Sequence, residues 1–417
     1  MDIRPGEWAL VAGSFFYFFF VLASYYTIRP LRDALAVSGG VDQMQYLFTA
    51  TLFCMIAIVP LYGWLTSRIA RRFFLPLVYG FFIANLLCIQ VLFQSMPDSI
   101  WLARGFFVWV SIFNLFVVSV FWSFMADLFD TNQARRLFGV IAAGGSAGAL
   151  AGPFLVRTLL GDIGISGLPL LSATLLSLAL ICLLWLISKD RKRQFEDRRL
   201  DPSIPIGGSI IAGAKLAVSH RYLTGFVGYI FLGTLTGSML YFQQAQVISD
   251  HFSTTEEVTA IFANLDLAAN SLTVLIQIAV TARLLGWLGM ATTLALLPVL
   301  ALAGFAVISF APVLALVVAI TVLRRAVLFG VANPTAGMLF TVVGPESKYK
   351  FKHFADTVIY RAGDSTGGWV FAGLMAAGAG MSGVAIAGMA AAGGWIFLAR
   401  WLGGRYHRMR ERDENLP

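Results

Sequence analysis

Two arginines and an aspartate stand together near the end of the first apolar stretch of this sequence, in SYYTIRPLRDALAV (24–37). Charged side chains are costly inside hydrocarbon, so Arg29, Arg32 and Asp33 are expected to face a cavity or a partner. Spacings of four, seven and eight residues from Tyr25 place all three on one helix face with that ring. Guanidinium groups bind phosphate or carboxylate through paired hydrogen bonds, and tyrosine adds a stacking surface. The segment therefore predicts a binding site for an anion, with an Arg29–Asp33 ion pair as the structural alternative.

Ionisable residues inside the later apolar stretches are few: Asp127, Asp266, Arg324, Arg325, Arg361 and Asp364. Arg324 and Arg325 are adjacent, so on a helix they point in different directions and at most one of them faces a cavity. Arg361 and Asp364 are three residues apart, which allows an ion pair that serves the structure or a gate. Arginine outnumbers carboxylate in the first and tenth apolar stretches, and this excess favours an anionic substrate.

The composition places these residues in membrane-spanning helices. The chain has 417 residues, of which 58% are hydrophobic and 12% charged, whereas soluble domains have about 25% charged residues. Stretches of about 20 apolar residues cross a bilayer as helices, because backbone groups in lipid must be satisfied within the segment. We therefore predict an all-α membrane protein with twelve transmembrane helices, at residues 8–36, 44–66, 73–95, 100–129, 136–160, 168–188, 221–248, 256–282, 288–309, 313–343, 354–378 and 381–401.

Charge in the loops orients these helices. The loops SRIARR (67–72) and KDRKRQFEDRR (189–199) and the tail RYHRMRER (405–412) are basic, whereas SDHFSTTEE (249–257) has no Lys or Arg. By the positive-inside rule both termini are cytoplasmic, in the cytoplasmic (inner) membrane.

The only long hydrophilic stretch divides the chain into two halves. We expect a six-helix bundle at 1–188, a cytoplasmic linker at 189–220, a second bundle at 221–401 and a tail at 402–417. Between the second and third helices, GWLTSRIARR (63–72) resembles the signature loop of the major facilitator superfamily, and ARLLGWLG (282–289) echoes it in the second half. The resemblance implies the major facilitator fold, a substrate site between the halves, and a monomer.

Three stretches resemble the nucleotide transporters, the ATP/ADP exchangers of plastids and intracellular bacteria. They are RPLRDALAV (29–37), FWSFMADLFDTNQARRLFGVIAAGG (121–145), and RAVLFGVANPTAGM (325–338) running into ESKYKFKHFADTVIYRAGDSTGG (346–368). The resemblance implies that Arg32, with Arg29 beside it, contacts phosphates, and that Arg325 and Lys352 act with it. The companion positions are Lys348, Lys350, Asp356 and Arg361. Leu328, Ala336 and Gly337 replace charged residues of those exchangers, so a different anion stays open as the substrate.

The resulting functional hypothesis is a secondary transporter that moves a nucleotide or another phosphorylated or organic anion, with an exchanger as one form. The candidate substrate-binding residues are Arg29, Arg32, Arg325, Lys352, Tyr25 and Gln243. The candidate gating or coupling residues are Asp33, Asp127, Asp266, Asp356, Arg361 and Asp364. The alternative is a proton-coupled carrier of an organic acid, drug or metabolite, for which Asp266 is the first choice of titrating carboxylate.

Other classes of protein are excluded by the residues present. The glycine-rich stretch AAGGSAGALAG (142–152) lacks the Lys-Ser or Lys-Thr of a phosphate loop, and its four-residue spacing predicts close helix packing instead. The four histidines and three cysteines form no metal-binding or catalytic pattern. We therefore expect no enzyme, no cofactor, no metal and no nucleic-acid polymer as partner, and the bilayer and a small anion as the partners.

Overall fold

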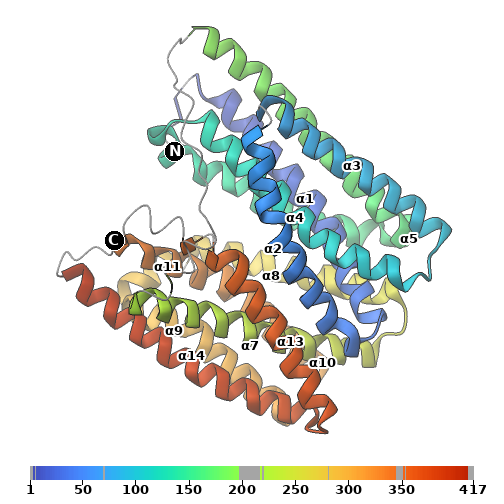
Figure 1. Ribbon diagram of the computed structural model, residues 1–417, viewed down its shortest axis with the longest axis vertical. Coiled ribbons are helices and arrows are strands. Elements are labelled where there is room, and N and C mark those ends of the chain that lie inside the picture. Colours follow the sequence, from blue (N-terminus) through green and yellow to red (C-terminus); the bar gives the residue numbers. More distant parts are fainter. Residues whose placement is uncertain are drawn as a thin grey trace. The chain divides into compact units, whose positions relative to one another are not determined.

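The computed structural model describes residues 3–4, 6–68, 71–196, 217, 220–279, 281–343, 351–352 and 354–411. These residues are helical apart from short connections, and ten of their helices are long and apolar enough to span a membrane (Figure 1). The prediction of an all-α membrane protein is confirmed.

The helices follow one another with short connections. They are α1 (Trp8–Ser38), α2 (Met44–Arg68), α3 (Arg71–Ser95), α4 (Ile100–Leu128), α5 (Thr131–Glu196), α7 (Arg221–His251), α8 (Thr255–Ala279), α9 (Thr281–Phe310), α10 (Leu314–Val327), α11 (Asn333–Met338), α13 (Tyr360–Ala376) and α14 (Gly380–Glu411). Short helices stand between some of them: the 3₁₀ turns η1 (Val41–Gln43) and η3 (Leu339–Val342), and the π turns η2 (Leu328–Ala332) and η4 (Ala355–Ile359).

The ten long apolar helices among the described residues cover eleven of the twelve predicted segments, and the described part of the twelfth, 354–378, is helical up to Ala376. The predicted segments 136–160 and 168–188 both lie in α5, where Gly164 alone interrupts the helix with φ +64°. Glycine adopts this backbone conformation without the steric cost that a Cβ would bring. The predicted segment 354–378 corresponds to the π turn η4 and the 17-residue α13, which follow one another directly.

The chain forms two compact units, each described separately below. Unit 1 comprises Met1–Gly39, Ile58–Pro205 and Thr254–Leu267, and unit 2 comprises Gly40–Ala57, Ile206–Ser253 and Ala268–Pro417. The start of α2 thus belongs to unit 2 and the start of α8 to unit 1. Helix α5 continues to Glu196, and residues 197–216 lie outside the described residues, so the linker at 189–220 stays a prediction.

In unit 1, α1 packs along α5 through the glycines that the sequence singled out (Figure 1). A Cβ on Gly148 would overlap the carbonyl oxygen of Phe19, and one on Gly152 would lie 2.8 Å from the carbonyl oxygen of Ala23. The two backbones meet this closely because glycine carries no side chain, as in other packed membrane helices. The prediction that these glycines serve packing is confirmed.

We expect Gly148→Ala to destabilise the protein by about 1–3 kcal/mol, the usual cost of overpacking a close contact. The measurement is the thermal unfolding of purified protein in detergent. Gly161→Ala is the matched control, because it lies on the same helix and a Cβ there meets nothing within 4 Å. Equal melting temperatures for the two variants would contradict the close packing of α1 on α5.

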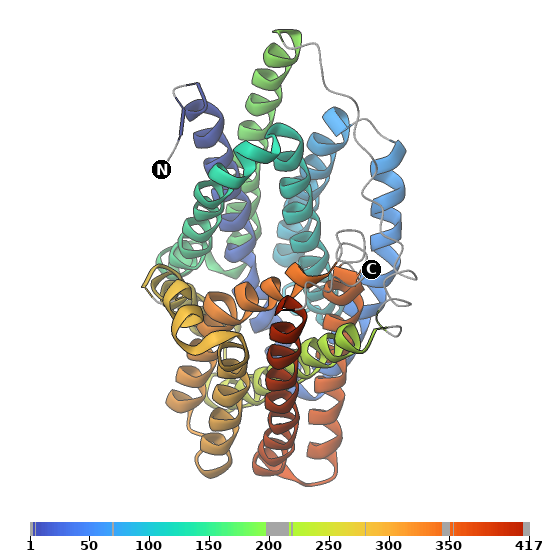
Figure 2. The same cartoon turned by 90° about the vertical axis from the view of Figure 1, so that its left-hand side faces the viewer.

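In unit 2, α7 packs against α13 and α14, and α9 packs along α14 (Figure 2). Here too, glycines allow the helix backbones to approach one another closely. A Cβ on Gly363 would lie 2.8 Å from the carbonyl oxygen of Phe231, and one on Gly367 would lie 2.6 Å from the carbonyl oxygen of Leu235. The charged face of α13 is therefore held directly against α7.

Candidate functional site

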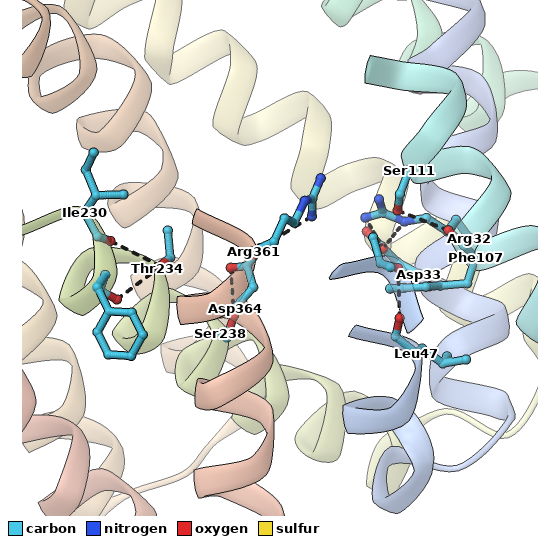
Figure 3. A network of polar contacts seen from close by, with 12 residues as sticks. Arg32, Asp33, Leu47, Phe107, Ser111, Ile230, Thr234, Ser238, Arg361 and Asp364 are labelled. Atoms are coloured by element: carbon cyan, nitrogen blue, oxygen red, sulfur yellow. Dashed lines mark hydrogen bonds and ion pairs between the residues drawn. The ribbon is translucent and has the colours of Figure 1, made fainter. Parts of the chain in front are cut away.

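The first-helix charges of unit 1 form two ion pairs. Arg29 Nη1 lies 3.4 Å from Asp266 Oδ1 of α8. Arg32 Nη2 lies 2.6 Å from Asp33 Oδ1, and Figure 3 shows this second pair. Asp266 is 2% exposed, and the Arg29 side chain is 18% exposed. The expected Arg29–Asp33 pair is replaced, because Arg32 folds back so that both its Nε and its Nη2 reach the neighbouring carboxylate.

These four side chains balance in charge. Two guanidinium groups face two carboxylates, so the group has no excess positive charge of the kind that the sequence suggested for α1. Aromatic rings complete it: the Arg29 guanidinium lies 5.4 Å from the ring of Tyr26, and that of Arg32 lies 5.1 Å from the ring of Phe107. Tyr25, the ring that we expected beside the arginines, is 8% exposed and packs edge-on against Tyr26.

In unit 2, one carboxylate joins α13 to α7. Asp364 accepts a hydrogen bond of 3.0 Å from Ser238 Oγ and pairs with Arg361 Nη1 at 3.4 Å (Figure 3). The predicted pairing of Arg361 with Asp364 is therefore present. Both side chains keep some exposure, 26% for Arg361 and 15% for Asp364. A second contact joins α13 to α2, because Thr49 shares a hydrogen bond with Ser365 at 2.9 Å.

Arg324 of α10 is half-buried and differs from Arg29, Arg32 and Arg361 in having no ion-pair partner among the described residues. Its guanidinium packs against α7 at Gly237, and it is close enough to interact electrostatically with Asp364. Its buried Nε finds no hydrogen-bond partner among the residues that the structure describes. A buried charged donor without an acceptor is costly, so an acceptor from outside the chain would stabilise it.

The sequence left the choice between the two adjacent arginines open, and the resemblance favoured Arg325. Arg325 is half-buried and has contacts of its own. In the structure Arg324 shares a helix face with Val317 and Thr321, which precede it by seven and three residues and are both buried. Gly237 and Ser238 carried no signal in the sequence, because their roles depend on contacts with α10 and α13.

The helix that carries Arg324 and the helix that carries Arg361 are each distorted by a π turn. The π turn η2 directly follows α10, and the π turn η4 ends immediately before Tyr360 and Arg361. Single π turns are rare in α-helices as a whole, but those that occur are often at functional sites. The two distortions therefore favour unit 2 as the location of a binding site.

The remaining predicted residues have other surroundings. Gln243 is fully buried, and its Nε2 donates to the carbonyl oxygen of Met381 at 3.1 Å, which gives it a packing contact. Asp127 is exposed near the end of α4. Lys352 is exposed, with its Nζ 5.8 Å from the Phe340 ring centre.

Three further predicted residues lie wholly or partly outside the described part of the chain. Lys348 and Lys350 lie outside the described residues. Asp356 lies in η4, and its side chain is outside the described part. Their roles stay predictions. No group of three or more His, Cys, Asp or Glu side chains that could hold a metal ion occurs among the described residues.

The sequence profile described as "Major Facilitator Superfamily" matches residues 9–351 of the chain, well over half of its length. The chain belongs to the major facilitator superfamily. This membership makes it a multi-pass membrane transporter rather than an enzyme. A search of curated protein sequences found no match.

Solved structures of other major facilitator proteins share the fold. A bacterial homologue of the iron transporter ferroportin in an inward-facing state is similar with a TM-score of 0.64 and 10% identity, over 96% of this chain and 98% of that one. The nucleoside transporter NupG is similar with a TM-score of 0.60 and 14% identity, over 97% and 99% of the chains. The human organic anion transporter MFSD10 is similar with a TM-score of 0.60 and 16% identity, over 96% and 100%. At these identities the likeness concerns the fold alone.

Unit 1 of this major facilitator protein also carries a charged cluster at the beginning of α1, which the sequence did not suggest. Glu7 accepts hydrogen bonds from Arg136 Nη2 at 2.9 Å and from Gln133 Nε2 at 3.1 Å, both on α5. The backbone N–H of Arg4 donates to it at 3.0 Å. The hydrogen bond from Arg136 is the largest cause that lowers the pKa of Glu7 to about 2. The carboxylate thus ties the first turn of α1 to the first turns of α5.

Because the folded pKa of Glu7 is depressed below the ordinary value of 4.5, its stabilising effect is present above pH 4.5. The effect declines below that pH and disappears as the pH falls through about 2. We expect Glu7→Gln to lower the melting temperature at pH 7, and the gap to wild type to shrink below pH 4.5. Melting curves in detergent from pH 7 to pH 3 measure this. A gap that does not change with pH would show that the charge of Glu7 is not what stabilises the contact.

Proposed function

We propose that this major facilitator protein is a secondary transporter of a small anion that works by alternating access, with the anionic group bound at Arg324. One observation carries the proposal: among the described residues the half-buried guanidinium of Arg324 has no ion-pair partner, and its Nε has no acceptor. Arg361 already has Asp364 as its partner, and Arg29 already has Asp266. An anion from solution supplies what Arg324 lacks.

The chemistry of arginine narrows the class of substrate. Its planar fork matches the paired oxygens of carboxylate and phosphate groups. The sequence resemblance to nucleotide transporters makes a nucleotide or another phosphorylated or organic anion the first class to test, with exchange as one form. Lys352 is exposed and suited to attracting such an anion toward the chain.

The test is uptake by proteoliposomes that hold the full chain. Labelled ATP and a panel of labelled organic anions are offered to vesicles that are empty or preloaded with ADP. We expect Arg324→Ala to reduce uptake by about 10- to 100-fold, which corresponds to the loss of charge-assisted hydrogen bonds. Arg400→Ala is the control, because Arg400 is an exposed arginine of α14. Uptake that is equal in both variants would refute the proposal. Uptake of ATP only into ADP-loaded vesicles would identify a nucleotide exchanger.

Coupling to protons is the second candidate, and the Arg29–Asp266 pair favours it. Such coupling needs a carboxylate inside the membrane, and Asp266, which is 2% exposed and paired with Arg29, is one. The same vesicles test this hypothesis. Uptake that continues at the same rate after the proton gradient is collapsed would remove it.

The basic loops support a placement in the cytoplasmic (inner) membrane with both termini inside. We further propose that the chain works as a monomer. Protease accessibility of a tag at each terminus in sealed vesicles of known orientation tests the topology, and light scattering in detergent tests the monomer.

A further inference from the structure

The contact between Gly237 and Arg324 is unlike the other glycine contacts of α7. The three atoms nearest to a Cβ placed on Gly237 all belong to the Arg324 guanidinium: Nη1 at 2.9 Å, Cζ at 3.5 Å and Nη2 at 3.6 Å. A Cβ on Gly233 would meet the ring of Trp395 at 2.8 Å, and one on Gly228 would meet Leu398 Cδ1 at 2.9 Å. Those two glycines leave room for apolar side chains of α14, whereas Gly237 leaves room for a charged guanidinium group.

Ordinary packing does not account for a glycine at this position. The end of an arginine side chain is flexible, so it could move aside from a methyl group at little cost in stability. The bare backbone at position 237 leaves room for the guanidinium to lie against α7. The next residue, Ser238, holds Asp364 at 3.0 Å, and Gly363 and Gly367 hold α13 against α7. The surroundings of Arg324 are therefore fixed on the α7 and α13 sides.

We propose that Gly237 is a positioning residue for the anion site, because its lack of a side chain lets the Arg324 guanidinium lie against α7. This inference rests on the proposed function. A methyl group at 237 would lie 2.9 Å from Arg324 Nη1 and displaces the guanidinium away from α7. Oxyanion groups, carboxylate or phosphate, then lose the paired hydrogen bonds that a correctly placed fork makes.

The position of Arg324 can be measured without knowing the substrate. Phenylglyoxal modifies exposed guanidinium groups, and mass spectrometry resolves the product at Arg324 from that at Arg325. We expect Gly237→Ala to speed modification of Arg324 by roughly threefold or more, because the displaced group loses burial. Gly228→Ala is the matched control, with the same 2.9 Å approach on the same helix but to an apolar atom. Modification of Arg324 at the wild-type rate in Gly237→Ala would overturn the inference.

Protection by anions separates this inference from the proposed function. Inorganic phosphate and ATP are added during the modification, and the concentration that halves the rate is recorded. We expect Gly237→Ala to raise that concentration about tenfold, with no change for Gly228→Ala. If neither probe, nor any anion of the uptake panel, protects wild-type Arg324, the proposed anion site fails, while the modification rates still decide the role of Gly237.

A double variant distinguishes positioning from general damage to the fold. Lysine at position 324 has no guanidinium for a methyl group to displace. Uptake by Arg324→Lys is therefore expected to stay the same when Gly237→Ala is added, whereas Gly237→Ala alone raises the KM of wild type with little change in maximal rate. Independent, additive losses from the two substitutions would overturn the inference.

Discussion

Removing either charge of the Arg29–Asp266 pair is expected to destabilise the protein by about 3–5 kcal/mol, the usual cost of leaving a buried charge without its partner. Asp266 is 2% exposed, so water cannot replace the lost arginine. The Arg29 side chain is only 18% exposed, so water can solvate it only in part once Asp266 is removed. The measurement is thermal or denaturant unfolding of Arg29→Met and Asp266→Leu in detergent.

The double variant Arg29→Met with Asp266→Leu is expected to be much more stable than either single variant. An apolar pair of similar volume avoids the cost of burying charge, so the losses are strongly non-additive. Arg400→Met is the control for removing a positive charge without removing a buried partner, and it should leave stability unchanged. Additive losses in the double variant would mean that the two side chains do not act as a pair.

The fold follows from the sequence to the extent that it depends on local properties. The length and apolarity of each segment predicted all-helical spans, and the spacing of Gly144, Gly148 and Gly152 predicted the packing of one helix on another. The local irregularities did not follow: Gly164 alone separates the two halves of α5, and the π turn η4 precedes α13. Such distortions depend on neighbouring helices rather than on a composition that a sequence window can show.

The sequence predicted the site less completely than the fold, because some ion pairs of the site join residues that are far apart in the chain. Spacing alone suggested Arg29–Asp33, but the partner of Arg29 is Asp266, on a helix whose approach to α1 the sequence does not reveal. Spacing did succeed for Arg361 and Asp364, which lie within one turn of the same helix. The role suggested for Gly237 could be recognised only from the guanidinium beside it.

Replacing Asp364 with asparagine is expected to strengthen anion binding while slowing transport. Asparagine keeps the size of the side chain and an oxygen that accepts the hydrogen bond from Ser238, but it removes one negative charge. Arg361 then loses its ion-pair partner, and Arg324 loses a nearby opposing charge. At the effective dielectric of a partly exposed site, a change of one charge corresponds to about 1–3 kcal/mol. The expected gain in affinity is therefore about 10- to 100-fold.

A tightly bound anion leaves slowly, so the maximal rate of Asp364→Asn should fall together with its KM. Initial uptake rates against substrate concentration in proteoliposomes separate the two constants. Ser238→Ala is the matched control, because it removes the hydrogen bond of 3.0 Å but keeps the charge of Asp364. A KM that rises in Asp364→Asn would show instead that the carboxylate serves to hold Arg361 in place for the anion. In that case the two arginines would bind the substrate only as a pair that Asp364 aligns.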